Sequence, residues 1–198
     1  MKTIIISLTI LLFQSFMAFG QEELKHPDIL VTEDNWGKEL FEFPIRFARE
    51  IQYTGMEEAR FPKGWGDSTS TEFWTYAFAW EIDTDGALAE EDFETNLKYY
   101  FDGLLGLNFD RKVKVTQTNA NFIKKESANN KSWYIGKINT FDTRFTQKPM
   151  RLHVQAESHF CENEKQSVIL FKFSPKPFED DVWKKLDGVQ IKDGFCDH

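Results

Sequence analysis

The stretch that decides the fold reads FWTYAFAWEI and spans residues 73–82. Every second side chain is large and apolar, as on one face of an extended strand. These large residues are Trp74, Tyr76, Phe78, Trp80 and Ile82. The second face carries the small residues Thr75, Ala77 and Ala79 and is not strongly polar either. A strand with two such faces is covered on both sides, so we expect a central strand of a sheet.

An amphipathic helix is predicted after this strand. Apolar side chains recur at helical spacing and form a single stripe. The stripe consists of Phe93, Leu97, Tyr100, Phe101, Leu104 and Leu105. The acids at residues 90–92 precede it, where the helix dipole favours negative charge, and Gly106 is a typical C-terminal stop. We expect this helix to pack on the sheet through its apolar stripe.

Upstream of residue 73 the pattern is less regular. Apolar side chains alternate from Phe41 to Phe47, and Pro44 within this run indicates an edge strand or a bulge. A second short strand is expected at residues 51–53. Residues 55–72 are rich in Gly, Pro, Asp and Ser, which are turn-forming residues. We therefore expect this stretch to be an irregular loop.

Downstream of the helix, strand-like runs alternate with short polar links. The runs lie at residues 112–123, 133–141, 150–160 and 167–173. This arrangement is typical of an antiparallel meander. A second helical stripe contains Val182 and Leu186 and ends at Gly188. The whole order predicts an α+β domain, a twisted and mostly antiparallel sheet with a helix packed on each face. We expect it to form a single domain over residues 37–198.

The outline resembles the PsbP-like family of small exported domains. The resemblance lies in Phe43-Pro44 of the first strand and in the ending, where residues 168–173 lead to a helix with Trp183 and Leu186. It extends over most of the chain after residue 20. Members of that family mostly act as accessory or binding proteins, so the resemblance implies binding rather than catalysis.

Residues 1–20 have the pattern of a secretory signal peptide. Lys2 precedes a mostly apolar run at residues 4–13, and the small residues Ala18 and Gly20 precede a cleavage point before Gln21. The apolar run is too short to span a bilayer of ~30 Å comfortably. We therefore predict a secreted or periplasmic protein, with residues 21–36 as an N-terminal arm.

The net charge and the two cysteines indicate which classes of partner to exclude and which compartment to expect. The chain of 198 residues carries 24 Lys and Arg against 32 Asp and Glu. Loss of Lys2 with the signal peptide leaves 23 against 32, a net charge of −9. Such a charge repels phosphate backbones and anionic headgroups, so we expect no nucleic-acid partner and no membrane after signal cleavage. The two cysteines, Cys161 and Cys196, are predicted to form a disulfide in an oxidising compartment.

Familiar catalytic motifs are absent from the sequence. It contains no Gly-x-Ser-x-Gly, His-Glu-x-x-His or Cys-x-x-Cys pattern and no phosphate-binding glycine loop. The leading hypothesis is therefore an exported binding or accessory protein whose partner is an unknown small molecule or protein. One alternative is a small hydrolase that uses scattered carboxylates such as Asp67, Glu72 or Glu157. Another is a subunit of an envelope assembly.

Two groups of residues are candidates for ligand binding. In the first, Trp65 stands between two glycines with Arg60 and Asp67 nearby, and an aromatic ring in such a loop can stack on a ligand. The alternative is that Trp65 plugs one end of the core. The second group is the aromatic face that includes Trp74, Tyr76 and Trp80, which can line an apolar cavity. The alternative is ordinary packing of this face beneath the helix.

One acidic segment has a weak calcium-like pattern. The acids Glu81, Asp83, Asp85 and Asp92 occupy positions 1, 3, 5 and 12 of a loop with glycine at position 6, as in an EF-hand. A strand precedes the loop, however, and the first and last acids are not those of an EF-hand. The alternative is a turn whose acids precede a helix N-terminus. We expect no cofactor, with calcium as the one metal under consideration.

Overall fold

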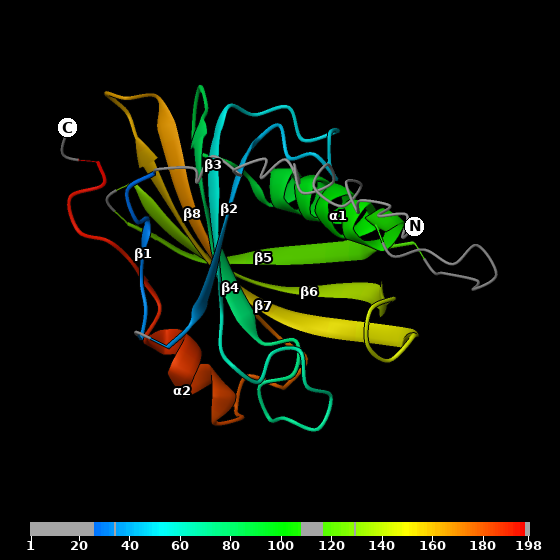
Figure 1. Ribbon diagram of the computed structural model, residues 1–198. Helices are drawn as coiled ribbons and strands as arrows, with labels where there is room; N and C mark the ends of the chain where they lie inside the picture. The colour runs from blue at the N-terminus through cyan, green and yellow to red at the C-terminus, as the bar shows by residue number, and fades with distance from the viewer. Residues whose placement is uncertain (1–25, 34, 108–116, 129, 197–198) are drawn as a thin grey trace, which may run out of the picture.

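The computed structural model describes residues 26–33, 35–107, 117–128 and 130–196 (Figure 1). The predicted signal peptide and residues 112–116 of a predicted strand lie outside these residues. Within the described part of the chain, seven strands form one antiparallel sheet in the order β2-β3-β4-β8-β7-β6-β5. The strands are β2 (Gly37–Phe43), β3 (Gly55–Phe61), β4 (Tyr76–Asp83), β5 (Asn119–Ala128), β6 (Lys131–Asp142), β7 (Lys148–Cys161) and β8 (Gln166–Ser174).

The central strand and the meander are confirmed. Strand β4 lies between β3 and β8, and its residues are buried on both faces. It begins at Tyr76, because residues 71–74 form a turn before it. Strands β5 to β8 pair consecutively, each antiparallel to the next. Strand β2 is an edge strand, as Pro44 indicated, and Pro44 follows it directly.

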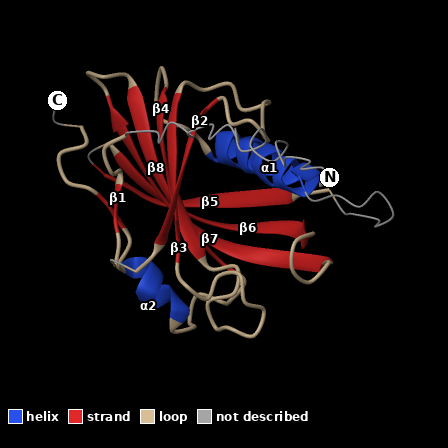
Figure 2. Cartoon of the chain, in the orientation of Figure 1, coloured by secondary structure: helices blue, strands red, loops and turns tan. Residues whose placement is uncertain are grey.

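Helix α1 (Glu90–Leu107) covers one face of the sheet (Figure 2). Phe93 and Leu97 of its apolar stripe are fully buried in one cluster with Phe78 and Trp80 of β4. Its N-terminal half also protects the β5 edge. The Glu94 carboxylate accepts the N–H of Phe122 at 2.9 Å, and Glu90 accepts that of Lys124 at 3.2 Å. These bonds satisfy edge amides that would otherwise be free to pair with another strand.

A mixed layer covers the other face of β4 and β8. It contains helix α2 (Val182–Asp187) and strands β1 (Leu30–Val31) and β9 (Gln190–Ile191), which pair with each other. The expectation of one helix packed on each face is therefore wrong. Helix α2 is only about 9 Å long at 1.5 Å per residue, too short to cover the sheet alone. The described residues are mostly strand with few helical residues, so the α+β class fits only loosely.

Strand β3 was not predicted. Residues 55–61 were expected to belong to an irregular loop, whereas they pair with both β2 and β4. The sequence places Glu57 and Glu58 side by side in the strand, and both are fully buried on opposite faces. Gly55 begins the strand at φ +138°, where a Cβ would meet the Glu81 carbonyl oxygen at 2.0 Å. The expected strand at residues 51–53 does not form.

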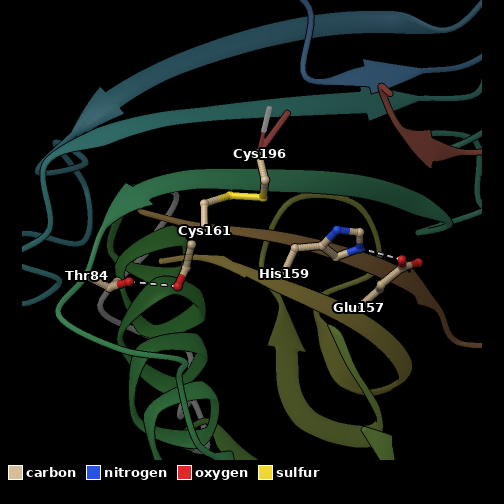
Figure 3. Close-up of a disulfide and its surroundings, with 6 residues drawn as sticks. Thr84, Glu157, His159, Cys161 and Cys196 are labelled. Atoms are coloured by element: carbon tan, nitrogen blue, oxygen red, sulfur yellow. Dashed lines mark hydrogen bonds and ion pairs between the residues drawn. A yellow bond between two sulfur atoms is a disulfide. The ribbon is translucent and has the colours of Figure 1, made fainter. Parts of the chain in front are cut away.

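The predicted disulfide joins Cys161 at the end of β7 to Cys196, with the two Cα atoms 5.2 Å apart (Figure 3). It attaches the segment after β9 to the sheet. Residues 26–36, expected as part of an N-terminal arm, include β1, and Ile29 and Leu30 are buried in the mixed layer. In the described ranges, no helix has the length and apolar character needed to cross a membrane.

Candidate functional site: an aromatic pocket

An apolar pocket of about 110 Å³ lies between α1 and one end of the sheet. Its walls come from β2, β3, β4, β6 and α1, together with the loop at residues 62–75 and the turn at residues 143–147. The main lining residues are Phe41, Phe61, Trp65, Trp74, Tyr76, Tyr100, Phe101, Leu104, Phe141 and Arg144. An engineered apolar cavity of about 150 Å³ binds benzene, so this pocket, at about 110 Å³, is somewhat smaller but on the scale of a single ring.

The 62–75 loop brings two tryptophans to the pocket. The Trp65 ring lies 4.8 Å from Phe61 and meets Trp74 edge-on at 6.2 Å. The loop is closed by two hydrogen bonds, from Trp74 N–H to the Trp65 carbonyl at 2.9 Å and from Gly64 N–H to the Glu72 carboxylate at 2.9 Å. Trp65 therefore packs against Phe61 and Trp74, which border the core, and forms part of the pocket wall.

Trp74 has an unusual backbone conformation. Its φ of 53° lies in the left-handed region, which costs energy for a bulky residue. The hydrogen bond to Trp65 holds it there. The indole Nε1 of Trp74 is buried and has no hydrogen-bond partner among the described residues. Backbone strain at a residue with an unsatisfied donor is a feature that calls for a functional explanation.

Tyr76 is the second polar group in the wall. Its side chain is 4% exposed and stacks on Phe173 at 4.9 Å and on Phe61 at 5.6 Å. Its hydroxyl also has no partner among the described residues. Burial, together with the charge of Glu57, raises the pKa of this hydroxyl well above its ordinary value. Tyr76 thus remains a neutral phenol at physiological pH.

Glu57 lies behind the pocket wall and is fully buried. Its carboxyl accepts hydrogen bonds from the Trp80 indole N–H at 2.7 Å and the Tyr100 hydroxyl at 2.7 Å. Burial raises the pKa of this carboxyl to about 8, although both donors favour the ionised form. Trp80, a sequence-predicted ligand residue, is therefore a partner of Glu57 and does not line the pocket.

Arg144 lies at the rim of the pocket. Its guanidinium is 5.5 Å from the centre of the Trp65 ring and 5.3 Å from that of Phe145. The Asp142 carboxylate orders this turn by accepting the N–H groups of Arg144, Phe145 and Thr146. The second charged residue of the lining is Glu39 on β2. The rim therefore carries both signs of charge, whereas the walls are aromatic.

Two predicted ligand residues lie elsewhere. Arg60 donates to the Glu58 carboxylate at 2.5 Å and does not line the pocket. Asp67 accepts the backbone N–H of Thr69 at 2.9 Å and its hydroxyl at 2.7 Å, and these bonds lower the pKa of Asp67. Of the six sequence candidates, the structure brings Trp65, Trp74 and Tyr76 together.

The carboxylates named in the hydrolase hypothesis also lie in different parts of the fold. Asp67 and Glu72 belong to the 62–75 loop, and Glu72 pairs with Lys185 beside its bond to Gly64. This lysine, as the main cause, lowers the pKa of Glu72. Glu157 is on β7, where it pairs with His159 at 2.5 Å (Figure 3). The three therefore do not line one pocket in the described chain.

The acids of the calcium-like segment have different surroundings. The Glu81 carboxylate lies 3.2 Å from His26. The Asp92 carboxylate accepts the N–H of Ala89 at 2.8 Å, which satisfies a donor at the start of α1. Asp83 is at the end of β4 and Asp85 is in the turn that follows. In the part of the chain that the structure describes, no three His, Cys, Asp or Glu residues are grouped to hold a metal ion. The calcium hypothesis stays a prediction.

Several residues of the site were not singled out by sequence reasoning. Phe61 and Glu57 belong to the unpredicted strand β3. Arg144 occupies a polar link between two strands and had no distinguishing pattern. Tyr100 was placed correctly in the helical stripe, but its hydroxyl contact with Glu57 spans 43 residues of sequence and has no local signal.

Comparison with protein-family models, with curated proteins and with solved structures found no match to this chain. The resemblance to PsbP-like domains stays a prediction, and the functional argument depends on the geometry of the pocket.

Proposed function

We propose that this protein is an exported binding protein that holds a small apolar molecule in the aromatic pocket. One observation carries the proposal: a cavity of about 110 Å³ has aromatic walls from several elements, and two of its lining residues carry buried polar groups without partners among the described residues. Small-molecule sites are typically apolar pockets with a few convergent polar groups. A ring inserted there would be surrounded on several sides by side chains already held in place.

The order of the surrounding loops supports binding by a preformed site. The Gly64–Glu72 and Trp65–Trp74 bonds hold one loop, and Asp142 holds the other. Glycine at position 64 fits this arrangement, because a Cβ there would lie 2.1 Å from the Ser70 hydroxyl oxygen and 2.7 Å from a Glu72 carboxylate oxygen, and both side chains would have to move. A preordered site loses less conformational entropy when it binds.

Export is inferred from two separate features. The first is the signal-peptide pattern of residues 1–20, and the second is the Cys161–Cys196 disulfide. Disulfides persist in oxidising compartments and are rare in the cytosol. We therefore assign the protein to the secreted or periplasmic fraction, where it would bind its ligand outside the cytoplasm.

The proposal is tested by titration with ethylbenzene, monitored through the indole N–H signals in a two-dimensional ¹H–¹⁵N NMR spectrum. We expect the signals of Trp65 and Trp74 to shift in a saturable manner. Those of Trp36 and Trp183 should remain in place, because both residues belong to the mixed layer on the other side of the sheet. An absence of saturable shifts, or equal shifts of all four signals, would contradict the proposal.

A cavity-filling variant gives an independent check. Leu104→Trp places a larger side chain at the half-buried wall of the pocket and should abolish ethylbenzene binding. Ile123→Trp is the matched control, since Ile123 is 64% exposed on β5 and does not line the pocket. The control variant should bind ethylbenzene as the unmodified protein does. Unaltered binding by a folded Leu104→Trp protein would place the ligand elsewhere.

A further inference from the structure

We propose that the pocket selects a neutral molecule with one hydrogen-bond acceptor, such as a ring bearing a carbonyl group, and that Tyr76 and Trp74 recognise the acceptor. The inference rests on the proposed function and adds the chemical class of the ligand to it.

Among the residues that line the pocket, Tyr76 and Trp74 each carry a buried polar atom with no hydrogen-bond partner in the described part of the chain. Their ring centres are 6.2 Å apart, both residues line the pocket, and both polar atoms are buried. Neighbouring polar groups are already paired: Tyr100 donates to Glu57, and the Thr140 hydroxyl lies 3.1 Å from that of Thr118. Unsatisfied buried polar groups are few in native proteins, and each requires an explanation.

The chemistry of these two groups defines what a ligand must supply. An indole N–H only donates, and a phenol hydroxyl can donate as well. A ligand atom that satisfies both must therefore be an acceptor. The desolvation of both donors already weakens the empty protein, so an acceptor that pairs with them recovers this free energy on binding. A purely apolar ligand would leave both donors unpaired.

The charges around the pocket favour a neutral acceptor over an anion. Glu39 is the acidic residue of the lining and lies at the rim. Glu57 behind Tyr100 adds no positive charge, and burial raises its pKa to about 8, so it is mostly neutral at physiological pH. The positive group of the lining, Arg144, lies over the rings of Trp65 and Phe145. A carboxylate next to Tyr76 would leave water and find aromatic walls in place of a cation, which is costly for a buried charge. A carbonyl or ether oxygen has no such cost.

The strained conformation of Trp74 supports the same assignment. The φ of 53° and the hydrogen bond to Trp65 fix the residue that carries the indole N–H in the pocket wall. Strain of this kind persists where the surrounding structure holds a residue in place, and such residues cluster at ligand sites.

The test compares acetophenone, ethylbenzene and benzoate as probes, with dissociation constants from NMR titration. Acetophenone and ethylbenzene have similar shapes and differ in the carbonyl oxygen. The decisive quantity is the ratio of the ethylbenzene dissociation constant to the acetophenone constant. We expect this ratio to fall about tenfold in Tyr76→Phe, the value of one hydrogen bond. Both of these probes should shift the Trp74 indole signal, but only acetophenone should move its proton downfield, because only acetophenone can accept a hydrogen bond from it.

Tyr53→Phe is the matched control. Its hydroxyl bonds to Asn96 at 3.0 Å and does not line the pocket, so the ratio should remain unchanged. Tyr76→Phe should fold, because it removes a hydroxyl that has no hydrogen-bond partner among the described residues. Trp74→Phe, which removes the indole donor and keeps a ring, should lower the ratio in the same direction.

The outcomes separate this inference from the proposed function. Binding of ethylbenzene and acetophenone with the same ratio in the unmodified protein and in Tyr76→Phe overturns the inference and leaves the proposed function intact. Tighter binding of benzoate than of acetophenone overturns the assignment to a neutral ligand. Binding of none of the three probes overturns the proposed function, and the inference with it.

Discussion

Glu57→Gln is the substitution that tests the buried carboxyl behind the pocket. Glu57 is enclosed by β4 and α1, where Trp80 and Tyr100 donate to it, and Glu39 on β2 adds a repulsive charge. Burial raises its pKa from an ordinary value of 4.5 to about 8 in the folded protein. Glutamine keeps the size of the side chain but does not titrate. Comparing the two proteins therefore isolates the contribution of Glu57 to the pH dependence of stability.

The sign of the pH dependence follows from the raised pKa. Between pH 4.5 and about 8 the folded protein holds this proton more tightly than the unfolded chain does. The associated stability is fully present below pH 4.5 and is lost as the pH rises through about 8. At about 1.4 kcal/mol per pH unit over this range, the loss is roughly 5 kcal/mol.

The assay is chemical denaturation of both proteins at a series of pH values from 4.5 to 9. We expect the free energy of unfolding of the unmodified protein, relative to Glu57→Gln, to decrease by several kcal/mol across this range. A pH-independent difference would refute the reasoning, as would a Glu57 carboxyl carbon NMR signal that titrates near 4.5.

Three further predictions concern stability and use the same denaturation assay. Tyr76→Phe should leave the free energy of unfolding unchanged or raise it by up to about 1 kcal/mol. Tyr100→Phe should lower it by about 1–3 kcal/mol, because the buried hydrogen bond from Tyr100 to the Glu57 carboxyl is lost. Equal effects of the two variants would contradict the difference in hydrogen bonding between the two tyrosines. Gly64→Ala should destabilise the protein by about 1–3 kcal/mol, because its Cβ would collide with side chains of its own loop. Gly86→Ala, which has no atom within 4 Å of the added Cβ, should change stability by less than about 0.5 kcal/mol. An unchanged stability of Gly64→Ala would show that the loop adjusts to the added Cβ without cost. Cys196→Ser should cost about 3–4 kcal/mol, as expected for opening a loop with a sequence separation of 35, and a loss below about 1 kcal/mol would mean that the terminal segment is held by other contacts.

The elements that were predicted correctly have local patterns that specify them. The alternation at residues 76–82 and the stripe from Phe93 to Leu105 report burial on one face of a strand or helix. The four runs of the meander are joined by short links, so consecutive strands pair with one another. The disulfide followed from the presence of two cysteines and a predicted oxidising compartment.

The pocket was predicted only in part. Trp65, Trp74 and Tyr76 were candidates because aromatic residues in a loop and on a strand stand out in the sequence. The choice between a core plug and a ligand site depends on what surrounds them. Phe61 and Arg144 complete the site from other elements, and their proximity is a product of the fold.

By itself, the sequence determined the central strand, the long helix, the antiparallel meander and the disulfide partners. Tertiary structure alone decided strand β3 and the position of the pocket. The physical reason is visible at Glu57, an acid that local patterns assign to a solvated loop. Its burial is compensated by donors 23 and 43 residues away, Trp80 and Tyr100. Such compensation depends on three-dimensional neighbours, which a pattern of adjacent residues does not contain.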